Sequence, residues 1–295
     1  MKEIKKEDIS QEVFNLYDDY VHNRLNKEDF TRKLSEHAAG GMTASDLLNF
    51  LMPDYDGKVQ VTPGDPRIQS EYVSYQSPKG GGNIEALLSL PVDLNKKFRG
   101  IIVVHENRGL NPHIEDVARR VALEGFISLA PDALTPLGGY PGSNDEGREM
   151  HSKRTTEEML EDFIAAYHYL KDHEKCNGKI GVVGFCFGGT IANLMAVKIT
   201  DLSAAVPFYG GQPPVEDVPH IKAPLLLHYA ELDTSYNAGW PAYEAALKAS
   251  NKAYTTYIYP QTNHGFHNDT TPRYEKAAAE LSWKRTIEFF ERKLK

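Results

Sequence analysis

The sequence is poor in cysteine, which excludes the small secreted proteins that disulfides hold together. Only Cys176 and Cys186 occur among the 295 residues, whereas a disulfide scaffold carries more. The apolar stretch 179–184 between them is typical of a β-strand, whose ends would lie roughly 20 Å apart. Because the Cα atoms of a disulfide lie within about 7 Å of each other, we predict two free thiols, which suits a reducing cytoplasm.

Long apolar runs are also missing. No stretch of 18 apolar residues occurs, and a membrane-spanning helix needs about that many. Residues 1–8 are strongly charged and no apolar signal-peptide core follows them. We therefore predict a cytoplasmic protein that does not contact a membrane.

Positive charge is in deficit, because the formal net charge is −8. Such a balance repels phosphate backbones and argues against a nucleic-acid partner. An apolar content of 41% and a charged content of 25% exclude disordered and collagen-like chains. The length is sufficient for one large hydrophobic core.

Residues 1–65 differ in pattern from the rest of the chain. Six apolar side chains there recur at helical spacing and predict an amphipathic helix: Ile9, Val13, Phe14, Tyr17, Val21 and Leu25. A second helix is predicted over residues 27–37, before Gly40 and Gly41. We expect these helices to form an arm that either packs on the main domain or pairs two copies in a homodimer.

A third helix and a linker complete this arm. Thr43 followed by Asp46 three residues later is a capping-box pattern, which predicts a helix start. Residues 55–66 are rich in glycine, proline and aspartate and are typical of a linker. The predicted division is therefore an N-terminal helical arm and linker over residues 1–65 and a catalytic domain over residues 66–295.

The main domain has the pattern of an α/β protein. Strand-like runs at residues 69–75 and 84–90 flank three consecutive glycines and predict a hairpin. The continuous apolar run 100–104 is typical of a strand buried on both faces. Helix and strand patterns then alternate to the C-terminus. Such βα repeats predict a mostly parallel sheet with helices on both faces, and ligands of such sheets bind at the carboxyl ends of the strands.

One cysteine lies in a turn between a predicted strand and a predicted helix. The sequence there is Gly184-Phe185-Cys186-Phe187-Gly188-Gly189, which is G-x-C-x-G in the setting of a nucleophile elbow. The glycines matter because side chains on so tight a turn would collide with neighbouring backbone. The start of a helix also favours thiolate. The alternative is a buried cysteine in a glycine-rich turn with no chemical role.

A thiol nucleophile needs a proton acceptor, and the acceptor needs a partner that orients it. Asp233 follows the predicted strand 224–230, and His264 follows the predicted strand 254–259. Both therefore lie at the same sheet edge as Cys186, in the order that this fold class uses. Glu231 and His267 are the alternatives for the two roles.

No cofactor or metal is implied by the residues around this set. His264 and His267 are three positions apart, but no set of cysteine, histidine and carboxylate ligands with metal spacing surrounds them. We therefore expect neither a cofactor nor a metal.

The loop after the buried strand 101–104 is the second candidate part of the site. In hydrolase folds this loop gives one amide to an oxyanion hole, and the residue after the nucleophile gives the other. These would be the amides of Asn107 and Phe187, each lowering the barrier by about 3 kcal/mol. Glu106 is either a structural polar residue or part of the site. Four further side chains are candidates for substrate binding: Arg108, Tyr209, Trp240 and Phe266.

Together these motifs resemble the dienelactone hydrolase family of the α/β-hydrolase superfamily, from about residue 84 to the C-terminus. The resemblance rests on His105-Glu106-x-x-Gly109, Ala130-Pro131-Asp132, the cysteine elbow, Asp233 and His264-Gly265-Phe266. It implies a hydrolase of esters or lactones with a triad of Cys186, Asp233 and His264. It also implies that Glu106 contacts the resting thiol and helps to generate thiolate.

The sequence departs from this family where the carboxylate of a dienelactone would bind. Family members hold it with two arginines, but Asn268 takes one of these positions and residues 133–139 contain no arginine. Arg108 and Arg148 are possible substitutes. We therefore expect an uncharged small ester or lactone as substrate. A thioesterase, a peptidase and a non-enzymatic redox sensor using Cys186 are the alternative functions.

Overall fold

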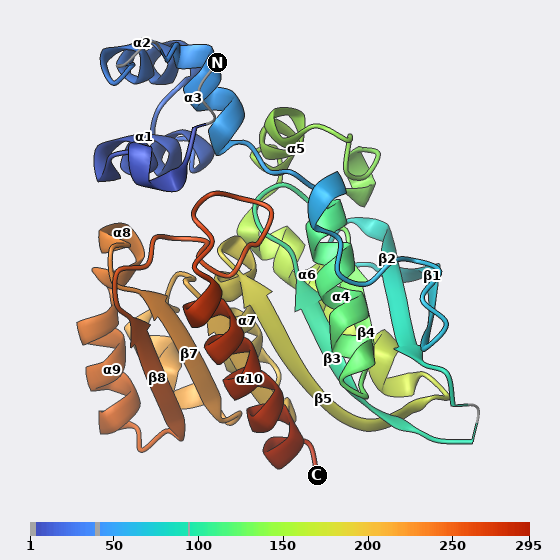
Figure 1. The fold of residues 1–295 in the computed structure, drawn as a ribbon. Helices are drawn as coiled ribbons and strands as arrows, with labels where there is room; N and C mark the ends of the chain where they lie inside the picture. The colour runs from blue at the N-terminus through green and yellow to red at the C-terminus, as the bar shows by residue number, and fades with distance from the viewer. Residues whose placement is uncertain (1–3, 39–41, 94) are drawn as a thin grey trace.

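A computed structural model describes residues 4–38, 42–93 and 95–295. One eight-stranded sheet runs through the main domain in the order β1-β2-β4-β3-β5-β6-β7-β8 (Figure 1). Its strands are β1 (Ile68–Ser77), β2 (Gly82–Pro91), β3 (Phe98–Val104), β4 (Ile127–Pro131), β5 (Cys176–Phe185), β6 (Ala204–Phe208), β7 (Leu225–Ala230) and β8 (Tyr254–Tyr259).

The sheet is mixed at one end and parallel elsewhere. β1 and β2 form the predicted antiparallel hairpin, in which Tyr75 lies opposite Ile84. β2 also runs antiparallel to β4, and the remaining neighbours are parallel. The predicted mostly parallel sheet is therefore confirmed.

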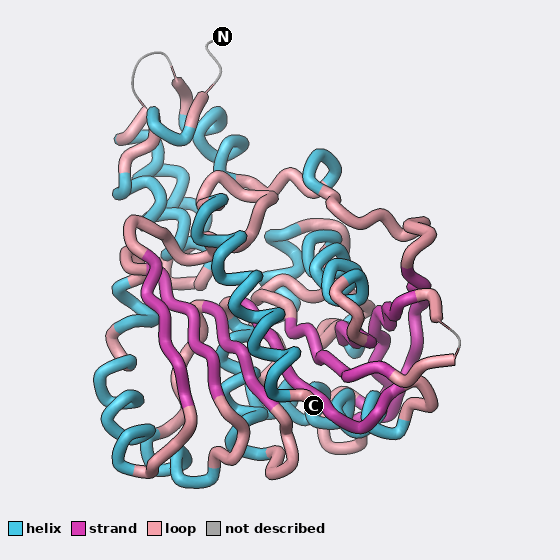
Figure 2. Tube along the Cα trace, turned by 60° about the horizontal axis from the view of Figure 1, so that its bottom comes forward, coloured by secondary structure: helices cyan, strands magenta, loops and turns pink. Residues whose placement is uncertain are grey.

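Helices cover both faces of this sheet, as the alternating pattern predicted (Figures 1 and 2). One face carries α4 (Pro112–Leu123) and α10 (Lys276–Lys293), and the other carries α6 (Thr156–Asp172), α7 (Phe187–Lys198) and α9 (Trp240–Ala249). The central strand β3 is buried on both sides, since Ile101 and Ile102 are fully buried in opposite clusters. This explains why its sequence is apolar without alternation.

Both cysteines are free, as predicted. Cys176 is the first residue of β5 and Cys186 follows its last residue. The strand is longer at its start than the sequence pattern indicated, so it keeps the two thiols further apart than expected.

Three helices form the N-terminal arm: α1 (Gln11–Val21), α2 (Lys27–Glu36) and α3 (Ala44–Leu51). They share a small apolar cluster of their own. The predicted capping box is present, because Thr43 and Asp46 bond reciprocally at the start of α3. Gly40 and Gly41 lie outside the described residues.

The first arm helix is shorter than predicted. It starts after Ser10 and ends at Val21, and Asn23 then adopts a left-handed backbone with φ of 58°. In Figures 1 and 2 the arm lies at one end of the molecule. Its α1 contacts residues that follow β3 and β5, including Asn107 and Cys186.

Two short helices were not predicted. These are α5 (Asn144–His151), which lies close to the arm, and α8 (Thr234–Asn237), which directly follows Asp233. Of the helices described, none combines the length and the apolar character that crossing a bilayer requires.

Candidate active site

Cys186 occupies the turn between β5 and α7 with a strained backbone, φ 57° and ψ −116°. Only a tight turn holds a non-glycine residue there. A Cβ atom on Gly184 would lie 1.9 Å from the carbonyl oxygen of Gly188, and one on Gly188 would lie 2.3 Å from that of Val104. The glycines are therefore required for strand, turn and helix to approach one another, and the cysteine is left at the start of α7.

His264 is held by Asp233 at the same edge of the sheet. Its Nδ1 lies 2.6 Å from Oδ2 of Asp233, and both side chains are buried. The other carboxylate oxygen of Asp233 accepts the amide of Tyr236 at 3.2 Å, so the acid is fixed by the helix that it caps. Nε2 of His264 has no hydrogen-bond partner among the described residues.

The two alternative residues lie in other surroundings. Glu231 accepts the backbone amide of Gln261 at 2.8 Å. The ring of His267 packs 5.1 Å from that of Phe185, and burial lowers the pKa of His267 to about 3. The geometry therefore favours Asp233 and His264 as the acid and histidine of the site.

A second histidine, which the sequence reasoning missed, contacts the thiol. Nε2 of His22 lies 3.3 Å from Sγ of Cys186, and the rings of His22 and His264 meet edge to face at 4.8 Å. The ligand-type atoms of the two histidines and the cysteine all lie within 4.8 Å of one another. The nucleophile candidate thus has two adjoining histidines beside it, one from the catalytic domain and one from the arm.

Asp18 orients His22. Nδ1 of His22 lies 2.8 Å from the carbonyl oxygen of Asp18 and 3.3 Å from its carboxylate. Because a carbonyl oxygen only accepts, Nδ1 carries the hydrogen and the lone pair of a neutral His22 is on Nε2, facing the sulfur.

Charge around the thiol favours the ionised form. Burial opposes ionisation of Cys186, but the neighbouring His264 and His22 outweigh it and lower the pKa of the thiol to about 6. Burial likewise opposes charging of His22, yet Cys186 and Asp18 raise its pKa to about 9. The pKa of His264 is raised too, because Asp233 and Cys186 outweigh its burial. These shifts favour an ionised Cys186 thiolate beside protonated histidine side chains.

Glu106 is buried close to this centre, and its Oε2 accepts a hydrogen bond from Nδ2 of Asn268 at 3.1 Å. Burial opposes its ionisation, but Arg108 and His113 outweigh that and lower the pKa of Glu106. The hydrogen bond to the thiol comes from His22. A direct role of Glu106 at the thiol stays a prediction.

The two residues predicted for the oxyanion hole, Phe187 and Asn107, lie in different local structures. Phe187 is the first residue of α7, where backbone amides lack partners within the helix. The side chain of Asn107 donates to the carbonyl oxygen of Val21 at 2.6 Å, so this loop also anchors the arm. That the two amides bind an oxyanion stays a prediction.

Both arginines proposed for a carboxylate contact the arm. Arg108 donates to the hydroxyl of Tyr17 at 3.2 Å. Arg148 donates to the carbonyl oxygen of Tyr20 at 3.1 Å and stacks over its ring at 4.3 Å. A third arginine, Arg273, was missed by the sequence reasoning.

The aromatic candidates separate into two groups. Tyr209 lies with its ring 4.9 Å from that of His264, and Phe266 supports it from the core at 5.5 Å. The ring of Trp240 instead packs against the ring of Tyr229, with their centres 5.3 Å apart. Among the described residues, Trp240 makes no ring contact with His264 or Tyr209.

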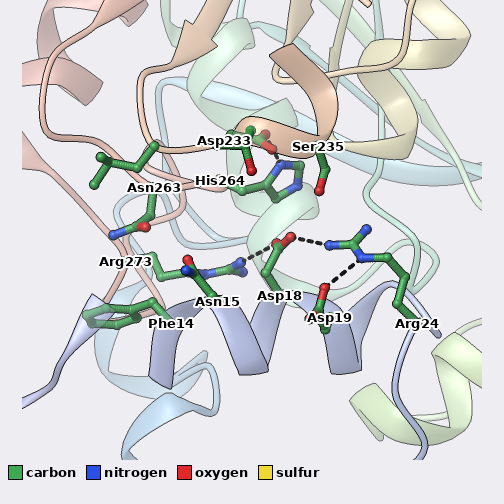
Figure 3. Close-up of a pocket in the computed structure, with 12 residues that line it drawn as sticks. Phe14, Asn15, Asp18, Asp19, Arg24, Asp233, Ser235, Asn263, His264 and Arg273 are labelled. Atoms are coloured by element: carbon green, nitrogen blue, oxygen red, sulfur yellow. Dashed lines mark hydrogen bonds and ion pairs between the residues drawn. The ribbon is translucent and has the colours of Figure 1, made fainter. Parts of the chain in front are cut away.

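A polar cavity of about 230 Å³ lies between α1 and the loops that carry Asp233 and His264 (Figure 3). Asp18 stands at its centre, with Arg24 2.6 Å away on one side and Arg273 3.4 Å away on the other. The carboxylates of Asp18 and Asp19 therefore neutralise the arginines that line the cavity.

In comparison with known proteins, the arm and the catalytic domain match two different families. The sequence matches the Dienelactone hydrolase family over residues 84–294 and the YqhI-like family over residues 1–40. A protein of Saccharolobus solfataricus, named "Putative carboxymethylenebutenolidase", is 32% identical over 250 residues, covering 72% of this chain and 95% of that protein. "Putative hydrolase fragment YghX" of Escherichia coli is 51% identical over 112 residues, covering 38% of this chain and 96% of its own length.

A solved structure shows the same architecture. It is the "Putative Dienelactone Hydrolase" of Klebsiella pneumoniae, which superposes with a TM-score of 0.68 at 26% identity and covers 75% of this chain and 98% of its own. The family match contains the cysteine elbow and the Asp233–His264 pair, whereas the arm that brings His22 lies outside it. The chain is a hydrolase with the α/β-hydrolase fold, and it belongs to the dienelactone hydrolase family.

Proposed function

We propose that the protein hydrolyses small esters or lactones with Cys186 as nucleophile, His264 as proton-transfer residue and Asp233 as the residue that orients His264. The observation that carries this proposal is the buried thiol within 4.8 Å of a ring nitrogen of His264, whose Nδ1 lies 2.6 Å from the carboxylate of Asp233. The names of the curated relatives, carboxymethylenebutenolidases, support a lactone or ester bond as the target.

The reaction would proceed through a thioester. The thiolate attacks the carbonyl carbon, the bond from that carbon to the leaving oxygen breaks, and the leaving alkoxide takes a proton from an imidazolium. Nε2 of His264 then takes a proton from water, whose oxygen attacks the thioester carbon. The carbon–sulfur bond breaks, and the acid and the thiolate are released.

We further propose that the preferred substrate carries no carboxylate near the reacting bond. A carboxylate loses hydration on entering a pocket, and a free arginine would have to replace that hydration. Arg108 and Arg148 are already engaged by α1, and Arg273 is paired with Asp18. The aromatic rings of Tyr209 and Tyr236 beside His264 suit an apolar acyl or alcohol group.

Replacement of the nucleophile tests the mechanism. Cys186→Ala is expected to lower kcat on p-nitrophenyl esters and small lactones by at least about 10³-fold, as loss of a triad member does. Cys176→Ser, at the far end of β5, is the matched control and should keep its activity. Alkylation with iodoacetamide should inactivate the wild type and the control alike. Near-normal turnover by Cys186→Ala would refute the mechanism.

A further inference from the structure

The arm repeats, beside the same thiol, the arrangement that the catalytic domain provides. His264 has its Nδ1 on the carboxylate of Asp233, and His22 has its Nδ1 on Asp18. Each histidine therefore turns Nε2 toward the centre where Cys186 lies. The hydrogen bond to the sulfur is made by His22 at 3.3 Å, while Nε2 of His264 is unpartnered among the described residues.

The end of α1 that carries His22 is firmly attached to the catalytic domain. Three hydrogen bonds join its last residues to that domain. Asn107 donates to the carbonyl oxygen of Val21 at 2.6 Å, Arg148 donates to that of Tyr20 at 3.1 Å, and the Tyr20 hydroxyl donates to Asp145 at 2.7 Å. His22 is the next residue after this anchored turn, and its side chain is only 9% exposed. Its contact with the sulfur is thus built into the fold.

We propose that His22 is a second catalytic histidine, which holds the proton of the Cys186 thiol in the resting enzyme and delivers it to the leaving alkoxide. The inference rests on the proposed function and assigns the two proton transfers of that reaction to two different histidines. His22 serves acylation and His264 serves deacylation: the thioester removes the thiolate charge that helps to raise the pKa of His264, so that its Nε2 can give up a proton to solvent and then take one from the attacking water.

The proton balance follows from the tautomer. The S–H bond breaks and an N–H bond forms at Nε2 of His22, which leaves the electron pair on sulfur and a hydrogen on each nitrogen of His22. When the thiolate has attacked and the carbon–oxygen bond breaks, the alkoxide takes the Nε2 proton and His22 becomes neutral. After deacylation the proton that His264 took from water returns to His22, His264 regains a proton from solvent, and the acid product loses its own proton to solvent.

The surrounding charges support a cationic His22. Asp18 contacts it directly, and Asp18 is itself paired with Arg24 and Arg273. Burial opposes the ionisation of Asp18, yet the neighbouring His264 and His22 outweigh it and hold the pKa of this carboxyl well below its usual range. Other charged or titratable groups around the pair, among the described residues, are His264, Asp233, Tyr236, Tyr209 and Glu106.

Alkylation of Cys186 by iodoacetamide across pH tests the resting pair, and it requires no turnover. In the wild type the rate should rise with an apparent pKa near 6. In His22→Ala and in His22→Gln, whose amide can form a hydrogen bond but cannot hold a proton, the apparent pKa should move upward by at least about one unit, because a cation that stabilises thiolate is lost. The control His37→Ala, on the same arm at the end of α2, should follow the wild type.

Leaving-group dependence tests the delivery of the proton. At a pH where Cys186 is ionised in every variant, His22→Gln should lose at least about tenfold in kcat/KM on an alkyl ester, whose alkoxide needs a proton. It should lose much less on the matched p-nitrophenyl ester, whose leaving group departs as an anion. An alkylation profile identical to wild type in both His22 variants, or equal losses on the two esters, would overturn the proposal. If Cys186→Ala remained active, the proposed function would fail while the alkylation profile still reported the His22–Cys186 pair.

Discussion

At the scale of single residues, the site depends on how each titratable group is oriented. His264 and His267 are three positions apart, yet one faces Asp233 and the other is packed against Phe185 and Phe208. The chain turns between them at Gly265, whose φ is 80°, a conformation that a residue with a side chain adopts only under strain.

His264→Ala and Asp233→Asn are expected to lower kcat by about 10³-fold or more, because base and orienter act as one unit with the nucleophile. Steady-state kinetics together with thermal unfolding will separate this loss from misfolding. His267→Ala should lower stability through the cavity that it leaves, with turnover per folded molecule largely kept. The assignment is wrong if the His267 variant loses turnover and the His264 variant keeps it.

Glu106 gives a prediction for pH and stability. Its pKa is lowered in the folded protein because Arg108 and His113 outweigh its burial. A lowered pKa stabilises the folded state at pH values above the ordinary value near 4.5, and this contribution is lost as the pH falls toward the lower folded value. Glu106→Gln should therefore have a smaller free energy of unfolding at pH 7, and the deficit should shrink below pH 4.5. Urea titrations at several pH values measure it, and a deficit that does not vary with pH would contradict it.

At the scale of elements, the crossing of β5, α7 and β3 is the tightest described part of the site. A Cβ atom on Gly188 would lie 2.3 Å from the carbonyl oxygen of Val104, and backbone cannot move aside without displacing the nucleophile. The arm depends on a different kind of contact, since α1 is held through hydrogen bonds to its last turn and through its buried apolar side chains.

Gly188→Ala is expected to destabilise the fold by about 3 kcal/mol or more, because overpacking against backbone has no cheap relaxation. Gly64→Ala is the matched control, since a Cβ there meets nothing within 4 Å, and it should change stability by less than about 0.5 kcal/mol. Chemical denaturation compares the two. Equal stability of both variants would show that the crossing can relax.

At the scale of the whole molecule, the distribution of charge supports the proposed preference for an uncharged substrate. The chain carries a net charge of −8, so its field does not attract anions. Locally, Asp18 and Asp19 together neutralise Arg24 and Arg273 in the cavity beside the triad candidates (Figure 3). The arm that brings His22 therefore also removes the positive charge that a carboxylated substrate would need.

A neutral lactone is expected to give a higher kcat/KM than a carboxylated lactone of matched size, by about tenfold or more, because the carboxylate would be desolvated without a free arginine. The measurement is a direct comparison of the two substrates on the wild type. A clear preference for the carboxylated lactone that disappears in Arg273→Gln, Arg108→Gln or Arg148→Gln would show that an arginine has been recruited as the clamp.

The use of the arm between two copies stays a prediction. In a single chain α1 already packs its apolar residues against its own arm, and its last turn accepts hydrogen bonds from its own catalytic domain. A dimer would have to meet through the remaining surface of α2 and α3 or exchange the arm between copies. Light scattering over a range of protein concentrations would decide between monomer and dimer.

The sequence by itself determined the fold class and the residues of the elbow. Period-two and helical patterns are local, so they predicted the hairpin and the strand over residues 254–259. The observed β8 has the predicted bounds, and both strands of the hairpin extend beyond theirs. Glycines forced by close backbone approach are equally visible in the chain. The order of strands at one sheet edge then placed Cys186, Asp233 and His264 together.

Only the tertiary structure decided what covers Cys186. Asp18 and His22 are four residues apart on one helix face, which the sequence shows, but 164 positions separate His22 from Cys186. Hydrophobic periodicity is a local pattern, so it cannot show that residues so far apart in the sequence come together. The arm reaches the thiol because its apolar cluster fixes α1 and because Asn107 and Arg148 bind its last turn, and such long-range packing arises only when both parts of the chain are folded.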